Sequence, residues 1–453
     1  MPEETVLVDS RRAVAPVAVS KARTSFVFLF LFLLLCFTTA TVWIREAWPL
    51  QAFQIGIYLL VAAQILSAGL RRKEDLAGGL IPLLVYLIPV WGIVQIAAQT
   101  TTSVFDTRAE VLRWGALAGV FYLSQTITRS RTDRERLLNA ILGFATAMAV
   151  LCLVQINTAH GSILWMIPTT YEEIYATFQN KNNFAQFIEV ALPIALWGAV
   201  RGGGRPWAYA LAGGVLYASA VSVASRAGFL LCTAELILVS AIGIFRSRGR
   251  ASRDLFRSAL ATVGIMALAA GAFTMAVGWR STLDRFNDKD PFAIRREYLL
   301  GAIEIAKHRP LTGSGLGTYV QVYQKYAVTD SYPFYANHAH NDWAEFAADG
   351  GLPFLALVSI PFLFAVPWMF QHPWALGLLA TMINAGVDYP FPRPGVSGWM
   401  FALLGTLYVT RKCEREEPLT AGSSSRNNEG IEDGNLQLHR RLGRHRRRHN
   451  LGD

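Results

Sequence analysis

Twelve apolar blocks, of which the last two are short, are the feature that most constrains what this chain can fold into. A helix needs roughly twenty residues, at about 1.5 Å each, to cross the ~30 Å hydrocarbon core of a bilayer. Hydrophobic residues make up 53% of the 453 positions and charged residues only 16%. The sequence therefore predicts an all-α polytopic membrane protein with about twelve transmembrane helices. The blocks are residues 25–44, 51–70, 79–98, 109–127, 137–156, 184–200, 207–223, 228–245, 258–278, 352–370, 374–387 and 396–410.

The basic residues between the blocks predict how the chain is oriented. Lys and Arg in short loops are retained in the cytoplasm. With the N-terminus inside, the cytoplasmic segments hold eighteen of them, and the shorter loops on the other side hold five, or six with Arg113. We therefore expect both termini in the cytoplasm. The five are Arg45, Arg108, Lys181, Arg226 and Arg393.

This orientation divides the chain into five parts. Residues 1–24 are a cytoplasmic segment, and residues 25–278 are helices one to nine, because the first block lacks a convincing cleavage site. Residues 279–351 form a large, partly helical loop on the other side, and residues 352–410 are helices ten to twelve. Residues 411–453 are a basic cytoplasmic tail that we expect to be disordered. The tail and the inner loops account for much of the +10 charge, which indicates a bilayer and not a nucleic acid as partner.

Two polar segments outside the large loop fall on the side away from the cytoplasm. Polar groups at membrane depth are expensive to hold without a function. Asn180 and Lys181 lie in an amide-rich run at the mouth of a helix, where a cap or turn and a ligand contact are both open. The turn Ser225-Arg226 offers a fixed positive charge that invites an anionic partner, with a snorkelling arginine as the alternative.

The large loop begins with an amphipathic helical pattern over residues 294–306. Arg295 and Arg296 near its start can meet an anion such as a diphosphate. Ion pairing with Glu297 or Glu304 is the alternative. The glycine-rich turn 313–319 that follows permits close backbone approach or a tight turn, and no strand precedes it to suggest a nucleotide fingerprint.

A histidine cluster over residues 337–343 ends the loop. His340 can take a proton from an acceptor hydroxyl, with Asp342 or Glu345 orienting its ring. His338 competes for the same role, and Asn341 lies beside both. The His-x-His pair supplies two metal ligands, but a third is not evident, so we expect no metal and no other cofactor.

Five motifs follow one another along the chain in a fixed order. They are Thr177-Phe178-Gln179-Asn180 with Asn182 and Ala185, Ser225-Arg226, Pro310 with Gly313, Gly315 and Gly317, His340-Asn341 ahead of Gly350-Gly351, and Asp388-Tyr389-Pro390. In this order they resemble the O-antigen ligase and O-antigen polymerase superfamily. The resemblance covers roughly residues 176–394.

The resemblance implies a metal-independent glycosyltransferase of the inner membrane. Such an enzyme moves a glycan from undecaprenyl diphosphate to an acceptor hydroxyl, on lipid A-core or another glycolipid or glycan, on the periplasmic side. By this resemblance His340 activates the acceptor, and Arg226 with Arg295 or Arg296 binds the diphosphate. A leaving diphosphate needs positive charge, which arginine keeps at any relevant pH. The further candidate substrate contacts are Asn180, Lys181, His338 and Asn341.

Several functions compete with this one. Ligase, repeat-unit polymerase and protein O-oligosaccharyltransferase share the motifs, and ligase is the slightly preferred reading. A polysaccharide flippase or other transporter predicts charges near the middle of several helices, where only Glu189 and Glu235 come close. A non-catalytic assembly protein would use the loop for binding alone.

Overall fold

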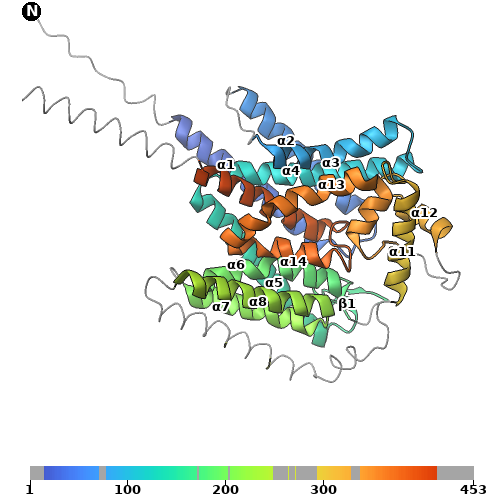
Figure 1. The fold of residues 1–453 in the computed structure, drawn as a ribbon. Helices are drawn as coiled ribbons and strands as arrows, with labels where there is room; N and C mark the ends of the chain where they lie inside the picture. The colour runs from blue at the N-terminus through green and yellow to red at the C-terminus, as the bar shows by residue number, and fades with distance from the viewer. Residues whose placement is uncertain are drawn as a thin grey trace, which may run out of the picture. The chain divides into compact units, whose positions relative to one another are not determined.

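The computed structural model describes residues 15–70, 78–170, 173–201, 205–247, 264, 271, 293–327 and 337–415. The chain divides into two compact units, Met1–Leu407 and Tyr408–Asp453. In the second unit, the described residues 408–415 are helical. The first unit holds all the labelled elements of Figure 1.

Helices follow the apolar blocks closely. The first eight are α1 (Ala15–Ala40), α2 (Trp48–Leu70), α3 (Leu80–Ala97), α4 (Val104–Ile127), α5 (Arg131–Thr158), α6 (Lys181–Val200), α7 (Pro206–Ser222) and α8 (Arg226–Ser247). A short antiparallel hairpin of β1 (Ser162–Ile163) and β2 (Ile167–Pro168) lies between α5 and α6. The prediction of a mostly helical protein is confirmed. The ninth block, 258–278, lies outside the described residues apart from positions 264 and 271.

The second half of the chain is also helical. It contains α11 (Ala293–His308), α12 (Tyr319–Tyr326), α13 (Asp342–Gln371), the 3₁₀ turn η1 (Pro373–Ala375) and α14 (Leu376–Asn384). A further helix covers residues 394–407 of the first unit. Proline residues separate it from α14, as expected for a residue type that cannot continue a helix.

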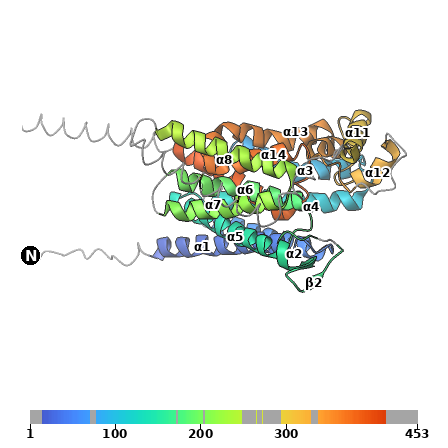
Figure 2. The same ribbon diagram turned by 90° about the horizontal axis from the view of Figure 1, so that it is seen from below.

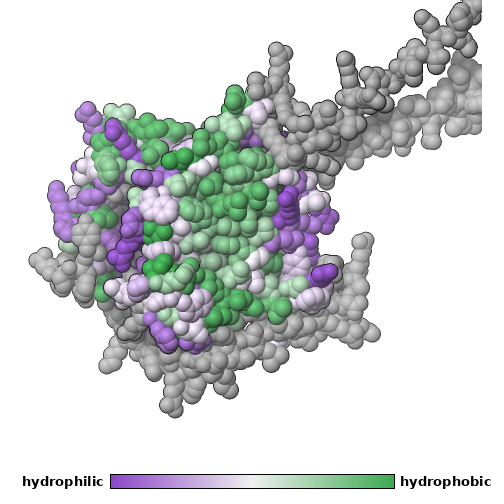
Figure 3. Space-filling view, turned by 180° about the vertical axis from the view of Figure 1, so that it is seen from behind, coloured by the Kyte–Doolittle hydropathy of each residue, from purple (hydrophilic) through white to green (hydrophobic). Residues whose placement is uncertain are grey.

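Six helices within the described part of the chain are long and apolar enough to cross a membrane. They are Trp48–Gly69, Leu80–Ala97, Arg131–Thr158, Lys181–Val200, Arg226–Arg246 and Asp342–Gln371, and Ser25–Ala40 is a shorter apolar helix. Large apolar side chains of α1, α2 and α3 are exposed, among them Leu29, Leu59 and Leu83. Figure 3 shows apolar residues gathered in a broad band with hydrophilic residues on either side. An exposed apolar belt of this kind indicates an integral membrane protein.

Helix α6 lies in the centre of the first unit and is buried along nearly all of its length. It packs against α5, α7, α8, η1 and α14. It comes close to α14 at Gly377, where an added Cβ would lie 2.7 Å from the carbonyl oxygen of Val190. The two backbones therefore touch there, which only glycine permits.

Helices α11 and α12 lie at the end of the helices away from the start of α1, called the loop end below (Figures 1 and 2). They are joined to α13 by a buried cluster that includes Tyr298, Tyr319 and Ala348. The phenol of Tyr319 donates a hydrogen bond of 2.9 Å to the carbonyl oxygen of Tyr298. This packing fixes α11 against the beginning of α13, and so places Arg295 near the histidine cluster.

The glycine-rich turn packs against α13. Ser314 and Gly315 donate backbone hydrogen bonds to the carbonyl oxygens of Ala348 and Asp349, at 2.9 and 2.8 Å. Gly351 breaks the helix with φ 70°, and an added Cβ would lie 2.6 Å from the carbonyl carbon of Leu311. The glycine-rich turn was expected to permit either close backbone approach or a tight turn, and these contacts show close backbone approach.

Candidate functional site

His340 and Asp388 form the centre of the site. The Nδ1 atom of His340 lies 3.2 Å from one carboxylate oxygen of Asp388. A guanidinium nitrogen of Arg295 lies 3.7 Å from the other oxygen. The Asp388 side chain is only 2% exposed, so this pairing is screened little by water. With the proton on Nδ1, the arrangement leaves Nε2 of His340 as a proton acceptor.

The backbone of His340 is held in an unusual conformation. Its φ is 50°, in the left-handed region that non-glycine residues seldom adopt. The next residue, Asn341, caps α13 by accepting a 3.0 Å hydrogen bond from the backbone nitrogen of Ala344, and its Nδ2 donates to the carbonyl oxygen of Gly386 at 2.7 Å. These bonds over-determine the turn, and strain of this kind is typical of functional sites.

His338 has a carboxylate partner of its own. Its Nδ1 lies 2.9 Å from Glu345, which also accepts a 2.7 Å hydrogen bond from the backbone nitrogen of Ala339. The ring of Tyr389 lies against both histidines, with centroids 4.4 Å from His338 and 4.8 Å from His340. The two histidines are therefore distinct, each with a separate acid and a shared aromatic neighbour.

The predicted orienting contact of His340 with Asp342 or Glu345 is replaced by the contact with Asp388. Asp342 is the first residue of α13, and its carboxylate accepts a 3.0 Å hydrogen bond from the backbone nitrogen of Phe391. Glu345 turns to His338 instead. Nearness in sequence was misleading here, because a helix start directs successive side chains to different sides.

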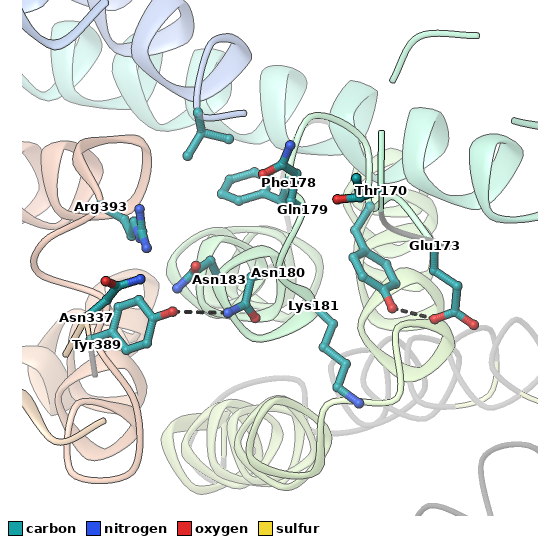
Figure 4. Close-up of a pocket in the computed structure, with 12 residues that line it drawn as sticks. Thr170, Glu173, Phe178, Gln179, Asn180, Lys181, Asn183, Asn337, Tyr389 and Arg393 are labelled. Atoms are coloured by element: carbon teal, nitrogen blue, oxygen red, sulfur yellow. Dashed lines mark hydrogen bonds between the residues drawn. The ribbon is translucent and has the colours of Figure 1, made fainter. Parts of the chain in front are cut away.

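A polar cavity of about 730 Å³ opens beside this cluster (Figure 4). Arg393, Asn337 and Tyr389 lie on one side of it and Glu173 on the other. The guanidinium of Arg393 lies over the Tyr389 ring, 5.2 Å from its centroid. The cavity is lined by Val42, Thr170, Glu173, Tyr175, Phe178, Gln179, Asn180, Lys181, Asn183, Asn337, Tyr389 and Arg393.

The start of α6 forms part of the cavity wall. The side chain of Asn180 caps the helix by accepting a 2.8 Å hydrogen bond from the backbone nitrogen of Asn182. Its Nδ2 also donates to the hydroxyl of Tyr389 at 3.3 Å, and Lys181 lines the same cavity. Asn180 is thus the cap of α6 and part of the cavity wall, and its contact with a ligand stays a prediction.

Arg226 lies at the first position of α8, beside the start of α6. The hydroxyl of Ser225 donates a 2.9 Å hydrogen bond to the Oδ1 atom of Asn182, which fixes the two helix ends together. In the large loop, Arg295 is the arginine next to Asp388, and Arg296 is an exposed neighbour on α11. The structure therefore brings Arg295, His338, His340, Asn341 and Asn180 into one connected set.

Three tyrosines border the histidine cluster. The ring of Tyr298 stacks on His340, with centroids 6.2 Å apart. Burial, and then the nearby Glu297, raise the pKa of Tyr298. Burial is also the main cause that raises the pKa of Tyr323 to about 12, and it raises that of Tyr319 further. These phenols stay neutral at any physiological pH and add no charge beside His340.

Asp388, Tyr389 and Arg393 are central to the site, but the sequence indicated them only weakly. Asp388 and Tyr389 stood in one late motif without a role, and Arg393 appeared only among the charges of the outer loops. The available signal for these residues was their place: a carboxylate, an aromatic ring and an arginine lie together in a proline-rich segment between two apolar blocks. Within the described residues, no group of three or more His, Cys, Asp and Glu could hold a metal ion.

Comparison with known proteins gives one family. A family model described as O-Antigen ligase matches residues 207–359. This span includes Arg226, Arg295, His338 and His340, but not Asn180 or Asp388. A search of curated proteins finds no match. The match supports a function of the O-antigen ligase or polymerase type, and residues 207–359 of the chain are similar to the O-antigen ligase family.

Proposed function

We propose that the protein is an O-antigen ligase-like glycosyltransferase of the inner membrane. It transfers a glycan from undecaprenyl diphosphate to a hydroxyl of an acceptor such as lipid A-core. The observation that carries this proposal is the contact of His340 and Arg295 with the two carboxylate oxygens of Asp388 at the loop end, next to a polar cavity.

His340 acts as the general base. Asp388 holds the proton on Nδ1, so that Nε2 accepts the proton of the acceptor hydroxyl. The acceptor oxygen forms the new bond to the anomeric carbon, and the bond from that carbon to the diphosphate oxygen breaks. The electron pair of the broken bond leaves on undecaprenyl diphosphate. Asp388 then stabilises the imidazolium that has formed, as a carboxylate partner does in other His-based sites.

Arginines receive the negative charge that develops on the diphosphate. Arg295 already contacts Asp388 and the carbonyl oxygen of Val387, which aims its guanidinium beside the reacting atoms. Arg226 and Arg296 complete the anion site from α8 and α11. Fixed positive charges at the leaving group can stabilise the transition state without a metal, so the reaction is proposed to be metal-independent.

The cavity holds the sugar next to the diphosphate. Asn180 and Lys181 line it, and amides and an ammonium group suit hydroxyls and anions. The ring of His338 stacks on Tyr389, which lines the cavity. Both polar groups of Asn341 are used to hold the turn at His340, so this residue contributes by positioning that turn.

The proposed topology follows from the loop charges. Both termini lie in the cytoplasm, about twelve helices span the inner membrane, and residues 279–351 form the periplasmic loop. The location of α11, α12 and the β hairpin away from the start of α1 supports one common face for the site.

A deletion strain examined for surface glycan tests the function. Loss of the ligase leaves long glycan chains on undecaprenyl diphosphate in the periplasm, with no transfer to lipid A-core. Single repeat units on the carrier would instead identify a polymerase, and loss of glycan from proteins would identify a protein O-oligosaccharyltransferase. Lipid-linked units trapped on the cytoplasmic face would contradict the proposal and indicate a flippase.

A further inference from the structure

Residues 384–389, called the linker segment below, begin at the last residue of α14 and contact several residues of the site. The carbonyl oxygens of Ala385, Gly386 and Val387 accept hydrogen bonds from the backbone of Asp342, the side chain of Asn341 and the side chain of Arg295, at 2.8, 2.7 and 3.0 Å. The next residue, Asp388, contacts His340. Every one of these contacts depends on where the linker segment lies.

Asn384 fixes the beginning of the linker segment. Its carbonyl oxygen accepts a 2.9 Å hydrogen bond from the backbone nitrogen of Asp388, and another of 2.9 Å from that of Val387. The turn so formed ties the carboxylate-bearing residue directly to Asn384. A displacement of Asn384 therefore displaces Asp388.

The Asn384 side chain is bound by two residues of α6. Its Nδ2 donates a 2.7 Å hydrogen bond to the Oε1 atom of Glu189, and its Oδ1 accepts one of 3.2 Å from Gln186. Glu189 is 0% exposed and Asn384 is 1% exposed. Both lie in the interior of the helix bundle. Holding an ionisable residue such as Glu189 there is energetically costly and indicates a function.

Backbone packing supports the same attachment. Gly377 and Asn384 are about two turns apart on α14 and so share a face. Gly377 contacts the backbone of α6 at Glu189 and Val190. Helix α14 is thus held on α6 both by close packing and by the hydrogen bonds of Asn384.

The other end of the linker segment is also attached to α6. The hydroxyl of Tyr389 accepts a hydrogen bond from Asn180, the cap of α6. Asn180 and Glu189 are nine residues apart on one helix, or roughly 13 Å along its axis. Two points on one rigid helix therefore define where Asp388 lies between them.

We propose that Glu189 is a positioning residue for His340: from the membrane-spanning part of α6 it fixes Asn384, and through Asn384 it fixes the carboxylate of Asp388. This inference rests on the proposed role of His340 as general base. Glu189 does not touch the reacting atoms. Its role is to accept a hydrogen bond, which a glutamine at the same position also does.

The test compares Glu189→Ala with Glu189→Gln in the full chain, reconstituted in lipid nanodiscs. Glu189→Ala should lower kcat for glycan transfer roughly ten- to a hundredfold, as expected when a reacting group is misplaced by about 1 Å. The KM for the lipid-linked donor should change less than kcat, because Arg226 on α8 and Arg296 on α11 lie outside the linker segment. Glu189→Gln should restore most of kcat. Equal losses in the two variants, or an unchanged kcat in Glu189→Ala, would overturn the proposal.

A second pair of variants covers the case in which Glu189→Ala does not insert. Asn384→Asp places a carboxylate against Glu189 and should lose activity. Adding Glu189→Gln reverses donor and acceptor, because the new amide can donate to the new carboxylate, and should recover activity. Failure to recover would contradict the pairing. Thr233→Val is the matched control, since it removes a hydrogen bond with Tyr217 between α7 and α8 and should leave kcat unchanged.

A chemical readout separates this inference from the proposed function. Diethyl pyrocarbonate modifies histidines, and tandem mass spectrometry gives the rate at His340 relative to the exposed His308 of α11. The ratio should change in Glu189→Ala, because the contact with Asp388 sets the exposure and tautomer of His340, and it should return in Glu189→Gln, whether or not glycan transfer is detected. An unchanged ratio in Glu189→Ala would show that Glu189 does not position His340.

Discussion

The Nδ1 atom of His340 lies 3.2 Å from a carboxylate oxygen of Asp388, a residue 48 positions later in the chain. A histidine with a buried carboxylate on Nδ1 and a free Nε2 is the arrangement that general-base catalysis requires. The second carboxylate oxygen faces Arg295. One acidic side chain thus links the proposed base to the proposed anion site.

His340→Ala should reduce glycan transfer by at least about a hundredfold, because general-base catalysis contributes roughly 10²–10⁴ in rate. The variant should still be produced and inserted, since the His340 side chain is at the loop end and is 23% exposed. Turnover of purified protein with lipid-linked donor and acceptor is the measurement. His338→Ala should cost much less, and the reverse order would assign the base to His338.

Asp388→Asn should lower kcat by at least about tenfold, because an amide no longer holds the His340 proton on Nδ1 or stabilises its imidazolium. The comparison is Glu345→Gln, which alters the carboxylate that contacts His338 and the backbone of Ala339. The same loss in both variants would indicate a general disturbance of the loop and not a role of Asp388 in orienting His340.

Arg226→Gln and Arg295→Gln should each weaken binding of undecaprenyl diphosphate by about tenfold, since a charge-assisted hydrogen bond contributes roughly 1.5 kcal/mol or more. Arg296→Gln should have a smaller effect, because Arg295 is the arginine beside Asp388. Arg201→Gln, at the C-terminal end of α6 and paired with Glu135, is the control. Equal affinities across all four variants would exclude an arginine site for the diphosphate.

Gly351→Ala should destabilise the protein by roughly 1–3 kcal/mol, because alanine is strained at φ 70° and its Cβ would collide with the carbonyl of Leu311. Gly143→Ala in α5 has no atom within 4 Å of the new Cβ and should be neutral or slightly stabilising. Thermal unfolding in nanodiscs measures both changes. Similar midpoints for the two variants would contradict the close packing of the glycine-rich turn on α13.

The sequence predicted the helices well because membrane spans need long apolar runs. Blocks such as 137–156 and 184–200 lie within α5 and α6, which extend by a few residues into their polar caps. The count of about twelve spans stays a prediction, since block 258–278 falls outside the described residues and α14 has only nine residues. The orientation of the helices was predicted from the Lys and Arg residues in the loops between the apolar blocks, and it stays a prediction.

The site was only partly predictable. The sequence singled out His340, Arg295 and Asn180 because polar groups at the ends of apolar blocks are conspicuous. The partner of His340 was assigned to Asp342 or Glu345, since sequence shows short-range neighbours, whereas Asp388 reaches it only through the packing of α13 and α14. The contact of Glu189 with Asn384 was equally hidden, because it joins residues 195 positions apart.

The lining of the cavity has a consequence for selectivity among sugars. Gln179, Asn180, Asn183 and Asn337 contribute four primary amides to its wall. Asn180 and Asn183 also bond within the protein. A primary amide has two donor hydrogens and two acceptor lone pairs, so each can still meet a hydroxyl group in either sense. An axial and an equatorial hydroxyl can therefore both be satisfied, so epimeric sugars should be bound with similar affinity. Stereochemical tolerance of this kind would let one transferase serve glycans whose repeat units differ.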